Sequence, residues 1–454
     1  MSVTAILWAT LYCAAILGSF INPLFGAIGY ALEYYMRPQL KWWGDDVPNL
    51  RYNLIISVVL GGTFLLRRSS LRPLVSPKNI PLRWMIAFAA IILVVTPTIA
   101  VDRDLSWFWG VRWIEVAIIF PMLLAGVIRS RGAFNLFAAA HMLGAFWWGW
   151  DAWNNPKRQA GRLLWVGSGD SLNDNAASAH LLTVLPFIAV YLLTEKDKRL
   201  RAVALIAAPF VINTIILCNS RGATVALVAG LLSAVLLIRS GYRMRVIGAG
   251  MAMALAVLLL ADQTYIDRQQ TTTEYQEDGS AQQRVQTWIA GYRLVKDRPF
   301  GAGGRGFHVL SPVYIPDIVA EHGGQRRAPH NTWVSVACEW GVLGFLCFAG
   351  LNGSTLMMLE RLKRRVSALG DSGTYYYWRA LALQVAIIAG LVAAAFTDRL
   401  YGESGYWMIG LAYALTRIQL TDAAEVGETA PAPDSVAPIG TRLRLPTLAG
   451  AHPR

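Results

Sequence analysis

Charged residues are scarce in this sequence. Asp, Glu, Lys and Arg account for only 15% of its 454 residues, whereas 55% are hydrophobic; soluble domains are usually about 25% charged. This composition excludes an ordinary soluble globular domain and predicts a membrane protein. The seventeen Trp and seventeen Tyr residues suit the aromatic belts that flank bilayer-spanning helices.

Cysteine is also rare and unpatterned. The four cysteines all lie in apolar segments, without C-x-x-C spacing (Cys13, Cys218, Cys338 and Cys347). Neither a disulfide framework nor a zinc site is expected, and the sequence predicts no metal and no cofactor. The formal net charge of +13 would favour nucleic acid as the partner of a soluble protein. In a membrane protein it is explained by basic cytoplasmic loops, so no nucleic acid is expected.

About twelve apolar segments can cross a bilayer as helices, because a span needs about 20 mostly apolar residues and the shorter segments can be extended by their neighbours. The first segment lacks the basic start and the cleavage site of a signal peptide, so it is expected to be retained. The predicted spans are 5–27, 53–66, 84–100, 111–128, 133–149, 176–193, 202–219, 222–238, 245–261, 331–357, 380–397 and 405–418.

The basic loops give the orientation of these spans. Threading twelve helices alternately puts five basic loops on one side, which the positive-inside rule makes cytoplasmic. The sequence therefore predicts an all-α polytopic integral membrane protein with both termini in the cytoplasm. Residues 1–420 form one domain, 262–330 form a long outer loop with an amphipathic helix, and 421–454 form a disordered cytoplasmic tail. The basic loops are 67–83, 129–131, 195–201, 239–245 and 360–379.

The stretch FGAGGRGF (300–307) spells the nucleotide-binding pattern G-x-G-x-x-G. However, no β-strand precedes it, no Lys-Ser or Lys-Thr follows it, and the predicted topology puts it outside the cytoplasm, where ATP is absent. The glycines are instead expected to let the backbone turn sharply and approach a neighbouring element closely.

Two further segments of the long loop carry candidate site residues. Residues 280–298 predict an amphipathic surface helix that stops before Pro299, with a Ser280–Gln283 capping box and Arg284 in its first turn. Its predicted apolar stripe is Val285, Trp288, Ile289 and Tyr292. His330 precedes Asn331, a predicted N-cap of the next span. The positive end of that helix should lower the imidazole pKa, so that neutral His330 can accept a proton. A solvated Arg284 and a merely capping or packing His330 are equally compatible with the sequence.

Other polar breaks reach the same outer face. The turn NSRG puts Arg221 between two apolar helices, where it either serves a site or only snorkels to the interface. Further polar residues are expected on this face from two more loops (Arg162, Asn173, Asn175, Asp398 and Arg399). Arginines, helix N-termini and a neutral histidine together favour a diphosphate ligand at a membrane surface.

These residues occur in an order that resembles a known superfamily. The stretch from Arg284 to Phe345 contains an Arg and a Trp on a helix, P-x-G-x-G-x-x-x-F, His-Asn and E-x-G-x-x-G. With NSRGA around Arg221, it resembles the bacterial O-antigen ligase and polymerase superfamily over about residues 160–418. The N-terminal INPLFGAIGYALEYYMRP is further similar to exosortase-associated O-glycosylation ligases.

The resemblance implies a GT-C-like, inverting, metal-independent glycosyltransferase of the bacterial inner membrane with a periplasmic active site. Its donor would be a glycan on undecaprenyl diphosphate, and its acceptor the lipid A–core of lipopolysaccharide. Carried over by motif, Arg221 and Arg284 would bind the diphosphate, and His330 would lie at the acceptor hydroxyl. Arg305 is added to the substrate-binding set from its position alone, together with Asn331 and Arg162.

Three alternatives stay open at this point. The acceptor could instead be another repeat unit, as in an O-antigen polymerase, or a protein side chain, as in an O-oligosaccharyltransferase. A polytopic transporter or flippase shares the helix count, although the sequence shows no internal repeat. Finally, Asp102 and Asp104 form a D-x-D pair that could hold a divalent cation, although the arginine between them disfavours one.

Overall fold

The structure is a computed structural model that describes residues 2–67, 80–159, 161–270 and 279–425. It is almost entirely helical, with one two-stranded antiparallel ribbon, β1 (Arg158–Gln159) and β2 (Arg162–Leu163). The first half of the chain contains α1 (Val3–Ile21), α2 (Leu24–Met36), α3 (Tyr52–Leu66), α4 (Ile80–Thr98), α5 (Arg103–Ile114), the π-helical turn η4 (Glu115–Ile119), α6 (Phe120–Val127), α7 (Arg131–Asn154), α8 (Asp174–Thr194) and α9 (Lys198–Leu217).

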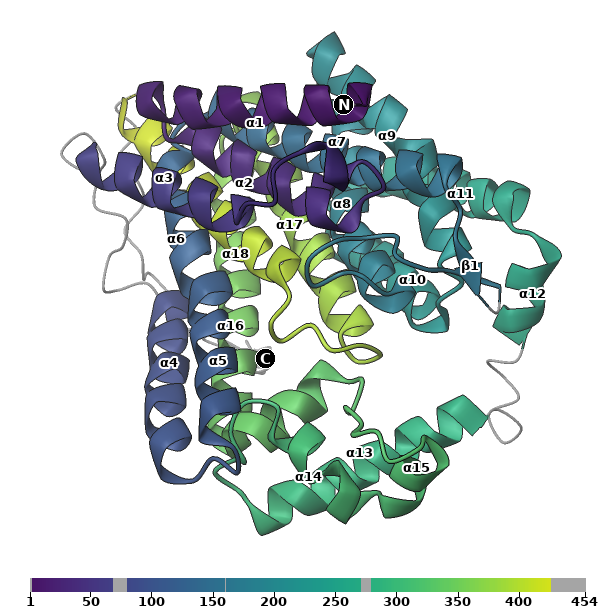
Figure 1. Cartoon of the computed structure of the whole chain (residues 1–454). Coiled ribbons are helices and arrows are strands. Elements are labelled where there is room, and N and C mark those ends of the chain that lie inside the picture. The colour runs from purple at the N-terminus through teal and green to yellow at the C-terminus, as the bar shows by residue number, and fades with distance from the viewer. Residues whose placement is uncertain (1, 68–79, 160, 271–278, 426–454) are drawn as a thin grey trace, which may run out of the picture.

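The second half contains α10 (Arg221–Leu237), α11 (Arg243–Leu260), α12 (Gln263–Gln270), α13 (Gly279–Asp297), α14 (Gly306–Tyr314), α15 (Pro316–Glu321), α16 (Thr332–Ser367), α17 (Asp371–Ala393) and α18 (Glu403–Glu425). Helices α13, α14 and α15 form a layer of their own at one end of the molecule, at the bottom of Figure 1.

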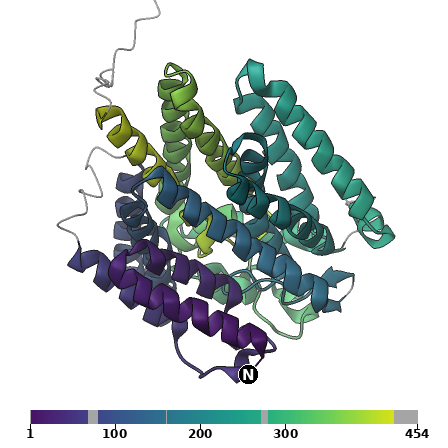
Figure 2. The same ribbon diagram turned by 90° about the horizontal axis from the view of Figure 1, so that it is seen from above.

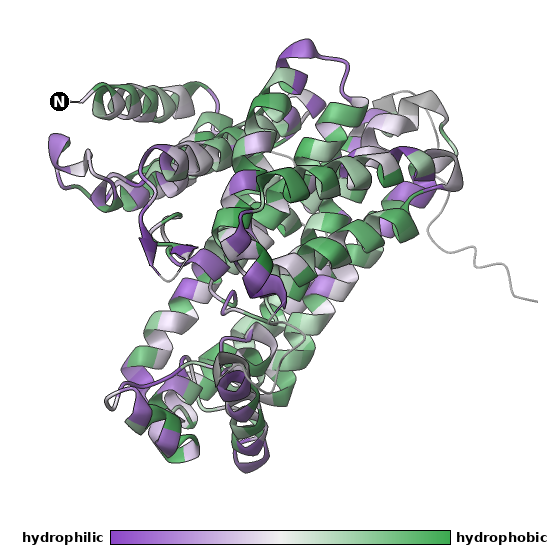
Figure 3. Ribbon diagram, turned by 90° about the vertical axis from the view of Figure 1, so that its right-hand side faces the viewer, coloured by the Kyte–Doolittle hydropathy of each residue, from purple (hydrophilic) through white to green (hydrophobic). Residues whose placement is uncertain are grey.

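The long helices are predominantly apolar, with scattered polar positions, as the mostly green ribbons of Figure 3 show. Within the described residues, eight helices are long and apolar enough to cross a membrane, and α3 and α10 are shorter apolar helices. The chain is thus an all-α polytopic membrane protein. Eleven of the twelve predicted spans fall on one continuous helical stretch to within a few residues at their ends, but the number of crossings remains a prediction.

The packing core joins helices that are distant in sequence. A large cluster of buried side chains is built mainly from α2, α7, α8, α17 and α18, and a second one packs α4 and α5 against α16. Pairs such as α7 with α9 and α8 with α17 lie in extensive contact. These two clusters fix the ends of the helices that carry the candidate site residues.

The prediction of a single span over residues 5–27 was wrong. Asn22 and Pro23 end α1, and α2 turns back beside it (Figures 1 and 2). The amide of Ser2 donates to Asp46 at 2.6 Å, and Arg67 donates to the carbonyl of Phe20 at 2.6 Å. Helix α1 therefore runs antiparallel to α2, and Ser2 lies at the same end of the bundle as Asp46.

The tail boundary is also different from the prediction. Helix α18 continues to Glu425, past the predicted start of a disordered tail at residue 421. Asp422 forms an ion pair with Arg131, 2.8 Å away, so this end of α18 lies beside the basic loop 129–131. The rest of the predicted tail, 426–454, lies outside the described residues, and so does the greater part of the basic loop 67–83.

The α1–α2 hairpin predicts an N-terminus outside the cytoplasm, in contrast to the cytoplasmic location predicted from the sequence. Ser2 lies at the Asp46 end, opposite the end of α3 that leads into the basic loop 67–83. In a Cys13→Ala background, which removes the exposed cysteine, Ser2→Cys should react with a membrane-impermeant maleimide in intact spheroplasts.

The matched control for this labelling is Lys198→Cys, which lies in a predicted cytoplasmic loop and should react only after permeabilisation. Labelling of Ser2→Cys that also requires permeabilisation would contradict the hairpin topology.

Candidate active site

The loop between α17 and α18 is fixed to the start of α16. The Thr332 amide donates to the Ala394 carbonyl (2.8 Å), and its hydroxyl donates to the Thr397 carbonyl (2.8 Å) while accepting from the Arg399 amide (2.7 Å). Asn331 starts α16 as the sequence predicted, since its side chain accepts from the amides of two residues in the first turn. These bonds place Asp398 next to His330, the residue that precedes this cap.

Asp398 contacts both His330 and Arg305. Its Oδ2 lies 3.9 Å from Nδ1 of His330 and 4.0 Å from the guanidinium of Arg305. The other carboxylate oxygen of Asp398 accepts from the Ser335 hydroxyl at 2.6 Å. Asp398 therefore lies between an imidazole and a guanidinium contributed by two other parts of the chain, which sequence reasoning did not anticipate.

The electrostatics of His330 favour the neutral imidazole. Partial burial of the ring lowers its pKa below the usual 6.5, Asp398 opposes this shift, and the charges of Arg284, Arg327 and Arg305 lower the pKa further. The predicted direction is confirmed, although burial rather than the helix terminus is the first cause. About half of the side chain, 52%, remains exposed, so it can reach a ligand. A neutral, accessible imidazole is suited to accept a proton.

Backbone strain gathers at the same place. Among the described residues, four non-glycine residues have a positive φ, and these include Asn219 (49°), Arg305 (57°) and His330 (50°). A left-handed conformation at a non-glycine residue costs about 1–3 kcal/mol and persists only where its surroundings impose it. Strain of this kind is common at functional sites, and two of the four residues, Arg305 and His330, are candidates that the sequence selected.

The glycine-rich loop docks on a break in α16. Gly341 has φ 70° and interrupts the helix; the amides of Ala302 and Gly303 donate to the carbonyls of Cys338 and Glu339, both at 2.9 Å. A Cβ at Gly301 would lie 2.5 Å from the Glu339 carbonyl oxygen. The glycines therefore allow close backbone approach, as predicted, and the partner is a transmembrane helix.

Arg305 extends from this loop over two aromatic rings. Its guanidinium carbon lies 4.2 Å from the ring centre of Trp109 and 5.7 Å from that of Tyr401. Tyr401 in turn donates a hydrogen bond to the buried Glu339. Cation–π contacts of this type hold an arginine in place without neutralising its charge, so Arg305 stays able to attract an anion.

Arg284 lies on the predicted surface helix, now α13. The helix position is correct, but only part of the predicted stripe of Val285, Trp288, Ile289 and Tyr292 faces the protein. Val285 and Trp288 are half-buried, and the Trp288 indole donates to the Pro329 carbonyl at 3.0 Å. Ile289 and Tyr292 are exposed, and the buried face of α13 is made by Thr287, Ala290, Gly291 and Leu294. Small residues are needed on this face because α13 lies very close to α16: a Cβ at Gly291 would be only 2.4 Å from Val334. Ser280, of the predicted capping box, lies in α13, but its side chain is outside the described part of the chain.

Arg221 is the first residue of α10. Ser220 caps this helix, accepting from the Ala223 amide, and the next residue, Gly222, lies against Phe396, because a Cβ there would be 2.5 Å from the Phe396 Cβ. The α10 N-terminus therefore abuts the same α17–α18 loop that carries Asp398. The α17–α18 loop therefore lies next to both Gly222 and His330.

Arg162 contacts a different set of residues. It forms an ion pair with Asp174 and donates to the Asn175 side chain at 2.9 Å, whose oxygen also accepts from Ser220 at 2.7 Å. The contacts of Arg162 therefore support the α10 N-terminus rather than His330. Nothing in the described residues joins it directly to Asp398.

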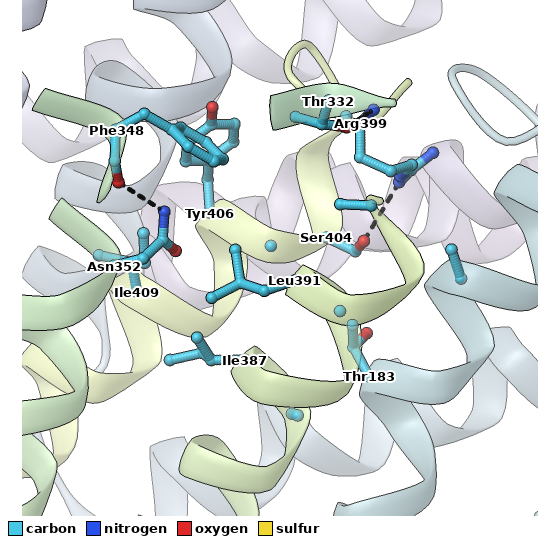
Figure 4. A pocket seen from close by; sticks show the side chains of 16 residues that line it. Thr183, Thr332, Phe348, Asn352, Ile387, Leu391, Arg399, Ser404, Tyr406 and Ile409 are labelled. Atoms are coloured by element: carbon cyan, nitrogen blue, oxygen red, sulfur yellow. Dashed lines mark hydrogen bonds between the residues drawn. The ribbon is translucent and has the colours of Figure 1, made fainter. Parts of the chain in front are cut away.

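A buried ionic network supports the loop from the other side. Arg399 pairs with Asp170 at 3.2 Å and donates to Ser404 at 3.2 Å (Figure 4). Burial raises the pKa of Asp170, but Arg399 and a hydrogen bond from Tyr34 outweigh it and lower the pKa to about 2. A cavity of about 50 Å³ lies beside Arg399, between the helices. Arg399 is thus held in a structural ion pair.

Asp102 of the D-x-D pair has a structural role in this fold, whereas Asp104 is exposed. The Asp102 carboxylate accepts from the Leu105 amide at 2.9 Å and so caps α5. Within the described residues, no group of three His, Cys, Asp or Glu residues is placed to hold a metal ion.

The fold and this polar end define a multi-pass membrane protein with a histidine–arginine site at one end of its helices. Residues 202–349 match the family model described as O-antigen ligase. This match supports assigning the chain to the O-antigen ligase and polymerase superfamily, whose members are glycosyltransferase-type enzymes. It includes Arg221, Arg284, Arg305 and His330 but less than half of the chain. No curated protein matches the sequence.

Replacing Gly301 by Ala should destabilise the protein, because the new Cβ would meet backbone of α16 at 2.5 Å and φ is 98°. We expect a loss of more than about 1 kcal/mol, measured as a lower midpoint of thermal unfolding in detergent. Gly323→Ala is the control, since Gly323 has φ 64° but no atom within 4 Å of a Cβ. Equal shifts in the two variants would refute the docking role of Gly301.

Proposed function

We propose that the protein is an O-antigen ligase that transfers a glycan from undecaprenyl diphosphate to a hydroxyl of the lipid A–core on the periplasmic face of the inner membrane. The observation that carries the proposal is the convergence of His330, Asp398 and Arg305, with the charge of Arg284 acting on the same imidazole. The family match supports the same class of activity.

In the proposed reaction, His330 is the general base. The acceptor oxygen attacks the anomeric carbon as its proton passes to His330, and the bond from that carbon to the diphosphate breaks, the leaving group taking the electron pair. A one-step displacement of this kind inverts the anomeric centre. Asp398 would orient the imidazole and stabilise its charge as the proton arrives, in the manner of other carboxylate–histidine pairs.

The departing diphosphate needs positive charge rather than protonation. We assign this role to Arg284 and Arg221, with Arg305 contributing from the glycine-rich loop. Guanidinium groups bind phosphate oxygens in a bidentate manner, and fixed positive charges near a developing anion stabilise the transition state. The proposal therefore requires no metal ion in the chemical step.

An apolar cavity suits the lipid part of the donor. It has a volume of about 100 Å³ and lies between α8, α10, α11 and α17, along the helix that begins at Arg221. Its lining is apolar, and Trp378 is its only aromatic residue. Helix α11 forms one wall, and only 6% of the residues in the apolar stretch of Ser240–Leu260 are buried. A polyprenyl chain in this cavity would leave its diphosphate near the α10 N-terminus.

The polymerase and protein-glycosylation alternatives use the same donor and differ only in acceptor. They are distinguished by offering lipid A–core, a repeat-unit glycolipid and a protein acceptor in parallel to the reconstituted protein. A transporter is a less suitable description, because His330, Arg305 and Asp398 meet beside the ends of helices instead of near their middle.

Replacing His330 by Ala should reduce transfer about 10²–10⁴-fold, the usual contribution of a general base, without changing thermal stability appreciably. Wild-type kcat/KM should fall as the pH drops below the pKa of His330, which lies below 6.5, because the protonated ring cannot accept a proton. The assay is donor-dependent glycosylation of lipid A–core in proteoliposomes.

His322→Ala is the matched control, since His322 belongs to the same long loop but bonds to the Ile318 carbonyl (2.8 Å); its activity should equal wild type. Full activity of His330→Ala would remove His330 from the mechanism, and an absence of transfer by the wild type to any of the three acceptors would reject the proposed function.

A further inference from the structure

Two adjoining cavities lead away from Asp398 and Arg305 toward the first helices. The inner one, of about 340 Å³, is lined by Arg305, Asp398, Tyr401 and Glu403 at one end and by residues of α2 and α5 at the other. The outer one, of about 1080 Å³, lies between the α2–α3 segment and α5. They share four lining residues (Glu33, Arg37, Asn53 and Arg112), so they form one path.

The lining of this path is mixed rather than uniformly charged. Arginines and carboxylates alternate with amides such as Asn49 and Gln39, and the aromatic residues Trp107 and Phe108 stand on its α5 side. Aromatic faces combined with donors and acceptors of both kinds suit a ligand that is rich in hydroxyl groups. A lipid tail, by contrast, would leave the polar groups of this lining without hydrogen-bond partners.

Arg37 is available for such a ligand. No carboxylate among the described residues forms an ion pair with it within 4.0 Å, whereas Arg112 is paired with Glu403. A Cβ at Gly169 would lie 3.3 Å from Nη1 of Arg37, so a glycine leaves space for the guanidinium at the point where the two cavities meet. The π-helical turn η4 begins at Glu115, three residues after Arg112, and such turns occur frequently at functional sites.

The position of the path fits the acceptor better than the lipid-linked donor. Phe396 packs against Gly222, beside Arg221, whereas Asp398, Tyr401 and Glu403 of the same region line the path. The α17–α18 loop thus separates the α10 N-terminus from the path. A one-step displacement requires the acceptor to approach opposite the leaving diphosphate.

We propose that the path between α2, α3 and α5 binds the sugar portion of the acceptor, which enters from the side of the bundle and presents its hydroxyl at His330 and Asp398. This proposal rests on the proposed function and adds the location and chemical class of the second substrate. Arg37 is a binding residue in it, and Val111 of α5 lines the outer cavity.

The test measures KM separately for the two substrates in proteoliposomes, with undecaprenyl-diphosphate-linked glycan and rough-type lipopolysaccharide as probes. Arg37→Ala should raise the KM for lipopolysaccharide by about tenfold, the effect of losing one charged hydrogen bond, and leave the KM for the donor unchanged. Val111→Trp, which fills the outer cavity without removing charge, should have the same effect. Arg103→Ala, an exposed arginine of α5 that lines neither cavity, should change neither constant.

A second readout tests the class of ligand. Core oligosaccharide without its lipid should inhibit wild-type transfer competitively with lipopolysaccharide, and this inhibition should weaken about tenfold in Arg37→Ala. A raised donor KM, unchanged acceptor KM in both variants, or activity with a protein acceptor only would overturn the proposal. Each of these outcomes requires an active wild type, so they are distinct from failure of the proposed function.

Discussion

The side chain and amide of Thr332 hold the candidate site together. Through three hydrogen bonds to residues 394, 397 and 399, this residue fixes the α17–α18 loop to the start of α16. Asp398 can meet His330 and Arg305 only because this loop is held there. The buried Asp170–Arg399 ion pair supports the loop from behind, and removing one partner of such a pair leaves an uncompensated charge. The reactive groups are thus carried by a rigid frame.

Sequence reasoning predicted the parts of the fold that depend on local patterns. Apolar runs predicted the helices, because backbone N–H and C=O groups inside a membrane must be hydrogen-bonded within the protein, and a helix does this within one segment. The cap at Asn331 and the surface helix that carries Arg284 followed from local residue types. The glycines of 300–307 were interpreted correctly as a close-approach segment, although their partner, the break at Gly341, lies forty residues away. The split of the first span had a visible signal in Asn22–Pro23, since proline ends helices.

Contacts between distant residues could not be predicted in this way. Asp398 was expected on the same face as His330, but its position between His330 and Arg305 depends on a loop bonded across 65 or more residues. Ile289 and Tyr292 of α13 were predicted to face the protein but are exposed. Periodicity alone does not show which face of a helix carries the small residues that allow close contact. The path lined by Arg37 and Arg112 brings α2 and α5 together, and no single-sequence pattern reports such a pairing.

The central claim is that His330 and Asp398 act as one unit, and a double-mutant cycle on kcat/KM for glycan transfer tests it most directly. His330→Ala, Asp398→Asn and the double variant are compared with wild type at a pH above 6.5, where His330 is neutral. The account predicts that the double variant is hardly slower than His330→Ala, because Asp398 acts only through the imidazole. Losses that multiply fully in the double variant would show independent roles and contradict the account.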